Sequence, residues 1–477
     1  MSRVLVTHSY FYRLDPKQWK DARPYPPMGS LLAASVLRES GHEVRFFDAG
    51  LAQGPEEMAD ALSSYRPEVL VIYDDGFNYL TKMCLTVMRD ACFRMIALGK
   101  ASGCKVLVSS SDSTDHPAEH LTAGADIIAL GEAEATVVEV LHAWENDRPL
   151  STIAGIAYMH EGQLHRTASR PVMRDLDALP LPAWDLIDME PYKAIWKRSR
   201  GYFSLNLATT RGCPFKCNWC AKPIYGNRYN SRSPEHVVNE IALLNERYAP
   251  DHFWFADDIF GLKPGWVQRF DAILKERGLR IRFKIQSRVD LLLENDTIDA
   301  LVSAGLEEVW VGAESGSQRI LDAMDKGTTV EQISLATRLL RAKGVRVCFF
   351  LQFGYRSETA ADVEATIRMV EELMPDDIGV SISYPLPGTK FHEQVRSEMD
   401  GKANWSDSDD LAMMFRQSHE PAYYKRLHRY VHKRYRLRQA IHAWKGRSGT
   451  AKRALSLFYY APALLIERTR LVRLARA

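Results

Sequence analysis

The sequence lacks any apolar run long enough to cross a bilayer. Its longest nearly uncharged apolar stretch, residues 454–466, has 13 residues and contains Pro462, whereas a spanning helix needs about 20. At the start of the chain, Met1-Ser2-Arg3 leads directly into Val4-Leu5-Val6, so the apolar segment and cleavage site of a secretory signal are also missing. These two absences predict a cytoplasmic protein.

Cysteine is scarce and unevenly placed. Seven cysteines among 477 residues are too few for a disulfide framework. Cys213, Cys217 and Cys220 fall within eight residues, a crowding that in a reducing compartment indicates a metal site rather than cross-links. The other four have no such neighbours, and Cys84 and Cys92, which share a predicted helix with three methionines, are expected to pack in a core.

Acidic residues are nearly absent from the C-terminal tail. Residues 421–477 hold 15 of the 62 Lys and Arg residues and one of the 60 acidic residues, Glu467. Their net charge is +14, against −12 for residues 1–420. The tail is therefore electrostatically separate within a chain whose total charge is only +2.

The first 150 residues alternate apolar, β-rich runs with helical patterns. Because the runs are rich in Val, Ile and Leu and helices fall between them, they predict a parallel, doubly wound α/β sheet. Residues 7–12, which leave the first strand, lack Gly-x-Gly-x-x-Gly, so a dinucleotide site of the usual type is not expected. The predicted strands are 3–7, 43–48, 69–73, 105–109 and 126–130, and the predicted helices are 27–39, 56–65, 80–101 and 134–145.

A second series of strands and helices begins near residue 203. A small hairpin at 156–167 and a proline-rich linker at 171–184 precede it. Six βα units predict a partial (β/α)6 barrel rather than an open sheet. The predicted strands are 203–208, 252–256, 282–287, 308–312, 345–353 and 377–384, and the predicted helices are 234–247, 265–276, 296–304, 330–343 and 359–373. The predicted domains are residues 1–150, a linker region 151–200, the barrel 201–400 and a basic helical extension 401–477.

The cysteine cluster follows the first strand of the second series. Gly212 and Pro214 supply the loop that three thiolates need in order to converge on one inorganic centre. Thiolates select soft metals and iron–sulfur clusters. The fourth ligand that a structural zinc needs is missing at short spacing, since His236 already lies in the next predicted helix. Three cysteines leave one iron of a [4Fe–4S] cube open for chemistry, and buried or zinc-bound cysteines are the alternative.

The run from Cys213 to Cys220 reads Cys-x3-Cys-x2-Cys, with Trp219 before the last cysteine, and it resembles the radical S-adenosylmethionine (SAM) superfamily. The resemblance implies that Cys213, Cys217 and Cys220 hold a [4Fe–4S] cluster whose open iron is chelated by the amino and carboxylate groups of SAM. It further implies reductive cleavage of SAM to a 5′-deoxyadenosyl radical. An external donor of the flavodoxin or ferredoxin type would supply the electron.

Polar residues follow other predicted barrel strands, where (β/α) barrels collect their functional groups. Asp257-Asp258, Arg288 and Glu314-Ser315 come after the second, third and fourth strands. Their surroundings, with Pro385-Leu386-Pro387-Gly388-Thr389, resemble a subgroup typified by the anaerobic magnesium-protoporphyrin monomethyl ester oxidative cyclase. The resemblance implies that Glu314 and Ser315 line SAM and that Arg288 pairs with a carboxylate. The alternatives are helix caps for the two aspartates and a surface ion pair for the arginine.

In the same subgroup an N-terminal doubly wound domain binds cobalamin, and the resemblance covers roughly residues 1–400. It implies a Rossmann-like, cobalamin-binding fold, with the corrin at the loops that follow the strands: 8–12, 74–78, 109–115 and 131–132. The candidate cofactor-binding residues of these loops are Ser110, Ser111, Gly131 and Glu132. Asp-x-His-x-x-Gly is absent, so cobalt is expected to lack a protein histidine. Because serines replace the usual glycines at 109–115, a vestigial or substrate-binding domain is the alternative.

The basic tail interleaves Lys and Arg with aromatic and aliphatic residues. This pattern is typical of a helix at a membrane interface, which would place the protein at the inner membrane face. A helical extension that covers the acidic body fits the charges equally well. Nucleic acid is not expected as a partner, because no recognised binding module accompanies the charge.

These patterns together predict a cobalamin-dependent radical SAM methyltransferase that acts on an unactivated carbon of a small-molecule or lipid-like substrate. The sequence assigns no side chain a catalytic role. A radical cyclase or rearrangement enzyme without methyl transfer is one alternative. A non-catalytic iron–sulfur protein for electron transfer or sensing is another.

Overall fold

The computed structural model describes residues 1–220, 224–399, 401–417, 419–446, 453 and 455–476. The chain divides into two compact units. Unit 1 comprises Met1–Pro214, Ala221–Phe283 and Asn404–Asp409, and unit 2 comprises Phe215–Cys220, Lys284–Ala403 and Asp410–Ala477.

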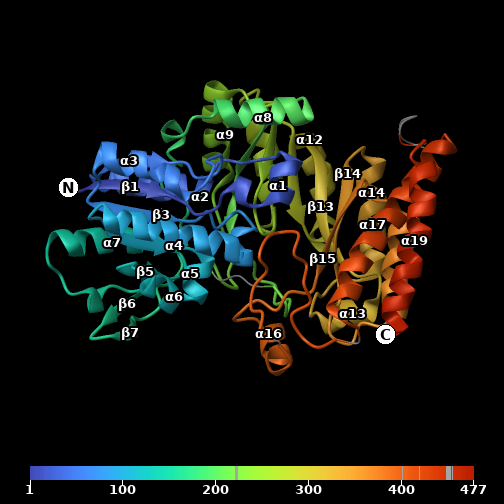
Figure 1. The fold of residues 1–477 in the computed structure, drawn as a ribbon. Coiled ribbons are helices and arrows are strands. Elements are labelled where there is room, and N and C mark those ends of the chain that lie inside the picture. The colour runs from blue at the N-terminus through green and yellow to red at the C-terminus, as the bar shows by residue number, and fades with distance from the viewer. Residues whose placement is uncertain (221–223, 400, 418, 447–452, 454, 477) are drawn as a thin grey trace. The chain divides into compact units, whose positions relative to one another are not determined.

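Unit 1 contains a seven-stranded sheet (Figure 1). Its strands are β1 (Arg3–Thr7), β2 (Glu43–Phe47), β3 (Val69–Tyr73), β4 (Lys105–Ser109), β5 (Ile127–Ala129), β6 (Ile156–His160) and β7 (Gln163–Arg166). The order is β2-β1-β3-β4-β5-β6-β7, with β1 to β5 parallel and the hairpin β6–β7 antiparallel at one edge. The doubly wound sheet is confirmed, and the order in which the chain adds strands reverses between β1 and β3, where sheets of this kind bind ligands.

Helices pack in pairs against this sheet. Apolar side chains of β1, β3 and β4, such as Val6, Val71 and Leu107, share one core with Leu37 of α2 and Leu141 of α7. The helices are α2 (Met28–Glu39), α3 (Met58–Tyr65), α4 (Thr86–Ala101), α5 (Ser111–Asp115), α6 (Pro117–Thr122) and α7 (Glu134–Glu145). Helix α2 contacts α7, and α3 contacts α4.

The prediction of one long helix over residues 80–101 is wrong for its first turn. The structure has a 3-10 turn at Thr81–Met83 and then Cys84 in the left-handed region, at φ 53°. A left-handed residue cannot continue a right-handed helix, so α4 begins only at Thr86. The helices α1 (Pro16–Asp21) and α8 (Glu190–Arg200) were not predicted.

The second series of strands forms a six-stranded sheet in the order β15-β14-β13-β12-β11-β8. The strands are β8 (Ser204–Leu207), β11 (His252–Phe255), β12 (Phe283–Ser287), β13 (Leu306–Glu314), β14 (Arg346–Phe353) and β15 (Asp377–Ile382). The helices between them are α9 (Pro234–Tyr248), α10 (Trp266–Glu276), α12 (Thr297–Ala304), α14 (Val330–Ala342) and α15 (Ala360–Leu373). Spatial order follows chain order, and β8/β11, β13/β14 and β14/β15 pair in parallel. The predicted partial barrel is confirmed.

The basic tail forms two helices of unit 2, α17 (Pro421–Trp444) and α19 (Leu457–Arg476), which lie side by side in Figure 1. Helix α17 contacts β15 and α15. Arg434 binds both Glu364 and Glu371 of α15 at 2.8–3.0 Å, and Arg436 donates to Asp377 of β15 at 3.0 Å. Helix α17 therefore covers acidic residues of its own unit, one of the two roles expected for the tail.

Among the described residues, none of the helices is long and apolar enough to cross a membrane.

Candidate cofactor sites

The segment that leads into the cysteines is held by Asp257, which follows β11. This buried carboxylate accepts hydrogen bonds from the backbone N–H groups of Thr209 and Thr210, both at 2.7 Å, and from their hydroxyls at 2.8 and 3.0 Å. Burial raises the pKa of Asp257 to about 6, against the effect of these four donors. The helix-cap alternative for Asp257 is wrong, because the following helix begins at Trp266 with Gly265 at its N-cap.

The loop itself depends on Gly212. The short strands β9 (Thr210–Arg211) and β10 (Asn230–Ser231) pair antiparallel and frame it. Gly212 has φ 76°, and a Cβ there would collide with the carbonyl oxygen of Arg228. The glycine that the sequence pattern required therefore stands where no other residue fits without strain.

The rest of the motif, Phe215–Cys220, lies in unit 2. Asn218 fixes it: the backbone N–H donates to Met324 O at 3.0 Å, and Nδ2 donates to Ala323 O at 2.7 Å. Its Oδ1 accepts the hydroxyl of Tyr355 at 2.9 Å. A turn closed by the Cys220 N–H and Cys217 O, at 3.2 Å, then sets the spacing of these two thiols.

The seven cysteines fall into two groups. All lie within the described part of the chain, and none is in a disulfide. Cys213, Cys217 and Cys220 are half-buried. The others are buried, and burial raises the pKa of their thiols: Cys84, Cys92, Cys104 and Cys348. A thiolate ligand needs the opposite environment, so the three motif cysteines are the group suited to a metal.

Positive charge collects beside Cys217. Arg288, at the end of β12, points Nη1 toward the Cys217 Sγ at 3.9 Å and stacks over the Phe215 ring at 3.7 Å. It also pairs with Asp290 at 2.9 Å. Arg288 is only 7% exposed, so the surface ion-pair alternative is wrong.

A second buried cation, Lys326, stands in the same site. Its Nζ donates to Glu314 Oε1 at 2.9 Å, and both side chains are less than a tenth exposed. Burial alone would lower the pKa of Lys326, but the negative charges of Glu314 and Cys217 raise it. Glu314 itself has φ 56° at a bulge of β13. No sequence pattern indicated Lys326, which lies twelve residues beyond its partner.

Ser315 lies beside Glu314, but its hydroxyl turns elsewhere. The Ser315 Oγ hydrogen-bonds to Thr366 Oγ1 at 3.1 Å and accepts the backbone N–H of Ser317 at 3.1 Å. Two buried donors of this region, Trp219 Nε1 and Thr328 Oγ1, have no hydrogen-bond partner in the described chain.

In unit 1, two of the four predicted loops converge on one pocket. His8 and Tyr10 follow β1, and Asp75 and Phe77 follow β3. The other residues that line this pocket are Tyr12, Tyr25, Pro26, Pro27, Asn78, Thr81, Asn206, Trp254 and Ala256. It lies at the switch point of the sheet, and six of its thirteen lining residues have aromatic rings. Burial raises the pKa of Asp75 to about 6.

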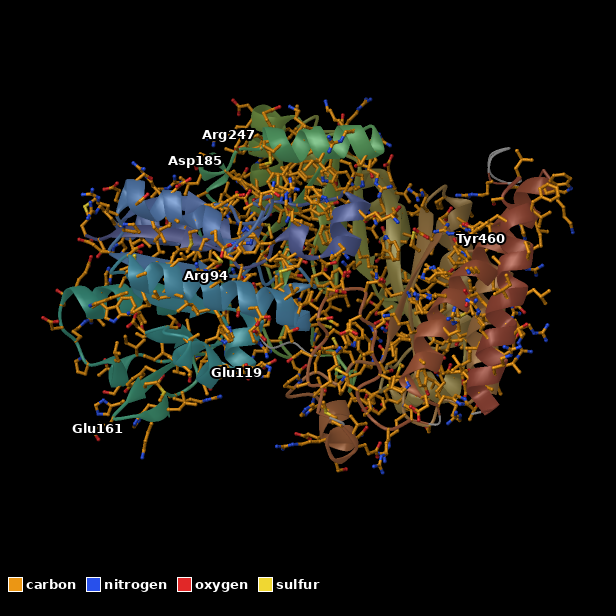
Figure 2. All side chains as sticks on the ribbon, viewed as in Figure 1. Arg94, Glu119, Glu161, Asp185, Arg247 and Tyr460 are labelled. Carbon is orange, nitrogen blue, oxygen red and sulfur yellow. The ribbon has the colours of Figure 1, made fainter. Side chains whose placement is uncertain are left out.

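The serine loop does not line that pocket but an adjoining hollow, which shares Tyr10 and Thr81 with it. Ser110 caps α5 by accepting the N–H of Ser113 at 2.8 Å, while the Ser111 Oγ is buried and has no partner among the described residues. Ser110 lines this adjoining hollow with Asp112 and Arg89. Arg89 bridges Asp112 to the Glu119 labelled in Figure 2.

Gly131 and Glu132 belong to a third cluster. Gly131 has φ 70°. The Glu132 carboxylate forms a buried ion pair with Arg211 and accepts the backbone N–H of Met173. Arg211 also binds Glu134 at 2.6 Å.

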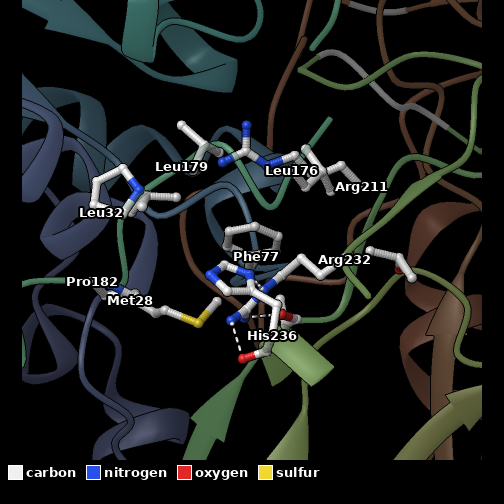
Figure 3. Close-up of a pocket in the computed structure, with 12 residues that line it drawn as sticks. Met28, Leu32, Phe77, Leu176, Leu179, Pro182, Arg211, Arg232 and His236 are labelled. Atoms are coloured by element: carbon white, nitrogen blue, oxygen red, sulfur yellow. Dashed lines mark hydrogen bonds between the residues drawn. The ribbon is translucent and has the colours of Figure 1, made fainter. Parts of the chain in front are cut away.

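Figure 3 shows Arg211 in a pocket with Arg232 and His236. The sequence did not indicate this pocket. Arg232 donates to His236 Nδ1 at 3.1 Å, and burial together with this cation lowers the pKa of His236. Met28, Leu32 and Phe77 are among the apolar residues that line the same pocket.

Comparison with known proteins identifies relatives of this chain. The family model of the radical SAM superfamily matches residues 207–370. An uncharacterized methyltransferase of Pyrococcus horikoshii is 30% identical over 375 residues, which cover 77% of this chain and 78% of the relative. The anaerobic magnesium-protoporphyrin IX monomethyl ester cyclase of Cereibacter sphaeroides is 29% identical over 282 residues, 58% of this chain, and the chain spans only 45% of the cyclase.

A solved structure has a similar fold. The cobalamin-dependent SAM radical enzyme OxsB, with aqua-cobalamin and SAM bound, superposes with a TM-score of 0.71 at 16% identity. The match covers 97% of this chain and 71% of that one.

Proposed function

This chain belongs to the radical SAM superfamily, and from that membership we propose that it is a cobalamin-dependent methyltransferase acting on an unactivated carbon. The observation that carries the proposal is the site in unit 2, where Arg288, Lys326 and Glu314 gather around Cys217. A protein that only shuttles electrons needs no such polar strand ends.

Cys213, Cys217 and Cys220 are assigned to a [4Fe–4S] cluster, which together with SAM supplies reductive cleavage of the sulfonium. The protein's own part is electrostatic. Arg288 and Lys326 place two cations beside Cys217, and these cations would offset the negative charge of a cluster bound there. The unpartnered donors Trp219 Nε1 and Thr328 Oγ1 fit a site built for a polar ligand.

Within this site, Arg288, Glu314 and Ser315 are assigned to SAM. The donors of Arg288 that Asp290 does not use are directed at the carbonyl oxygens of Lys326 and Gly327 and at Cys217, so a ligand carboxylate would replace one of these contacts. Glu314 is held in place by Lys326, which leaves its second oxygen for a ligand donor. The Ser315 hydroxyl is hydrogen-bonded to Thr366 and Ser317. Ser315 therefore contributes to the SAM site through its backbone and through the shape of the turn.

Unit 1 is assigned to cobalamin, which supplies the methyl group to be transferred. The aromatic side chains between the ends of β1 and β3 offer ring faces against which a planar ligand would stack, and the buried Asn206 Oδ1 has no partner among the described residues. His8 Nε2 is bound to Asp48 at 3.2 Å, which suits a cobalt without a protein imidazole.

The remaining candidates receive separate roles. Ser111, with its unpartnered hydroxyl, is assigned to a polar part of the cofactor. Ser110 shapes the loop as a helix cap. Glu132, through Arg211, fixes the turn at Gly131.

The substrate is a small or lipid-like molecule, and the reductant is a protein of the flavodoxin or ferredoxin type. The second candidate function is a radical cyclisation without methyl transfer, which the 29% identity to the magnesium-protoporphyrin ester cyclase favours.

One experiment separates these functions. Protein reconstituted anaerobically with iron, sulfide and methylcobalamin is incubated with SAM, dithionite and candidate substrates. Formation of both 5′-deoxyadenosine and S-adenosylhomocysteine supports methyl transfer, whereas 5′-deoxyadenosine alone supports the cyclase or another radical reaction.

The cluster assignment has a matched pair of variants. Cys217→Ala should lose the iron, the absorbance near ~400 nm and SAM cleavage, because two irons would then lack thiolates. Cys104→Ala, which removes a buried thiol that donates to Pro67 O, should keep all three. Zinc in the isolated protein without any uptake of iron would contradict the assignment.

The cobalamin assignment is tested by spectroscopy. Reconstituted protein should retain hydroxocobalamin through desalting, with a spectrum that shows no protein nitrogen on cobalt. His8→Ala should leave that spectrum unchanged. Failure to retain any corrin would contradict the assignment.

A further inference from the structure

The outer helix of the tail, α19, has one packed face and one exposed face. Leu457, Tyr460, Leu464, Glu467 and Leu471 are half-buried or buried and recur at intervals of three and four residues, which is the spacing of one helix face. This face includes the labelled Tyr460 of Figure 2. The packed face alone accounts for how α19 is attached to its own unit.

The opposite face exposes large apolar side chains. Phe458, Leu465 and Val472 lie seven residues apart, and therefore in one stripe, and are 67%, 66% and 42% exposed. Tyr459 and Ile466, beside this stripe, are 63% and 52% exposed. Exposed apolar patches of this kind mark interaction surfaces.

Some charged residues of the two tail helices form ion pairs between the helices, and others face away from them. Glu467, the single acidic residue of the tail, is 3% exposed and binds Arg426 and Lys433 of α17 at 2.8 and 2.7 Å. The exposed Arg468, Arg470 and Arg473 form no ion pair within the described chain, and at helical spacing they lie within and at the margins of the exposed face rather than in the apolar stripe itself. The outer face of α19 is therefore apolar and basic, without an accessible carboxylate.

We propose that the outer face of α19 binds the surface of an anionic phospholipid bilayer. Phe458, Leu465 and Val472 would enter the boundary between head groups and acyl chains, and the arginines would reach the phosphates. The helix lies in the interface and does not span it. A second copy of the chain is a poorer partner for this face, because docking two such faces would bring unpaired arginines together without any acidic residue to offset them.

The test uses the full-length reconstituted protein and flotation with vesicles. One set is pure phosphatidylcholine, and the other contains 30 mol% phosphatidylglycerol, an amount of about one lipid in three that gives a strongly negative surface. The protein should float with the anionic vesicles only, and about 0.5 M salt should release it.

Three variants separate the contributions. Arg468→Gln/Arg470→Gln/Arg473→Gln should weaken binding about 100-fold, at about fivefold per arginine. Phe458→Ser/Leu465→Ser/Val472→Ser should weaken it at least about tenfold. The matched control, Leu335→Ser/Leu339→Ser on α14, removes two other exposed leucines, 51% and 43% exposed, and should bind like the unchanged protein.

Circular dichroism and cluster absorbance should be the same in all four proteins, so that lost flotation reports the surface alone. Equal flotation of the α19 variants and the control would overturn the proposal. Self-association in gel filtration that the Phe458 variant abolishes would also overturn it, and so would tight binding of duplex DNA that the arginine variant loses.

Discussion

Replacing Lys326 by methionine should destabilise unit 2 by leaving a buried carboxylate without its cation. Lys326 and Glu314 are 8% and 6% exposed at the side chain, and their charged atoms are 2.9 Å apart. Methionine fills a similar volume, so the main change is electrostatic. Among the described residues, no second cation is bonded to Glu314, so none would neutralise its charge in place of Lys326.

The magnitude follows from the geometry. At 2.9 Å and an effective dielectric constant of about 20, the attraction amounts to about 6 kcal/mol. Desolvation of both groups offsets part of it, and removal of one partner of a buried pair costs about 3–5 kcal/mol. We therefore expect Lys326→Met to lower the free energy of unfolding by that amount.

The double variant Lys326→Met/Glu314→Gln provides the control. Because it also removes the stranded charge, it should recover at least half of the loss. Urea unfolding of the three proteins at one pH measures both values. A single variant within about 0.5 kcal/mol of the unchanged protein would refute the reasoning, and so would a double variant as unstable as the single one.

The same pair should influence the reduction potential of a cluster bound at Cys217. Lys326 lies within electrostatic reach of Cys217, whose charge raises the lysine's pKa. Removing this cation should make reduction of a cluster bound there harder, because the added electron loses a favourable charge. An EPR-monitored titration should show a more negative potential for Lys326→Met, and an unchanged or higher potential would contradict this.

Three further predictions concern other buried or paired charges. Burial raises the pKa of Asp257 from 3.8 to about 6. The free energy of unfolding of the unchanged protein should therefore fall by ~3 kcal/mol as pH rises from about 4 to 6. Urea titrations of Asp257→Asn should not show this fall. Burial raises the pKa of Glu358 to about 8, so stability should decline again up to pH ~8, and a Glu358→Gln variant with the same slope would contradict the assignment. Arg434→Met should lower the melting temperature by breaking the contacts with Glu364 and Glu371, a loss of about 2 kcal/mol; an unchanged melt would show that α17 is held by its apolar face alone.

The strands were predictable because their signal is local. All eleven predicted strands occur within a few residues of the predicted positions, and so does the hairpin at 156–167. Buried parallel strands must be apolar over their whole length, so short Val-, Ile- and Leu-rich runs indicate them without knowledge of their neighbours. The domain boundaries at residues 150, 200 and 400 stay predictions.

The cysteine motif was predictable for a similar reason. Three thiols and the loop-forming Gly212 lie within nine residues, so their spacing alone predicts a metal or iron–sulfur site, and the assignment of the individual ligands stays a prediction. The orientation of Ser315 could not be derived, because the hydroxyl turns to Thr366, a residue 51 positions away.

By itself, the sequence determined the two sheets, the cysteine motif and the separate charge of the tail, since each depends on residues close together in the chain. Tertiary structure decided the rest: that Asp257 holds Thr209 and Thr210, that Lys326 balances Glu314, and that Arg434 of the tail binds acidic residues of α15. These pairings depend on which strand ends and helix faces become neighbours. That choice is made by packing of the whole unit, because a charged group is buried only where folding brings a partner to it.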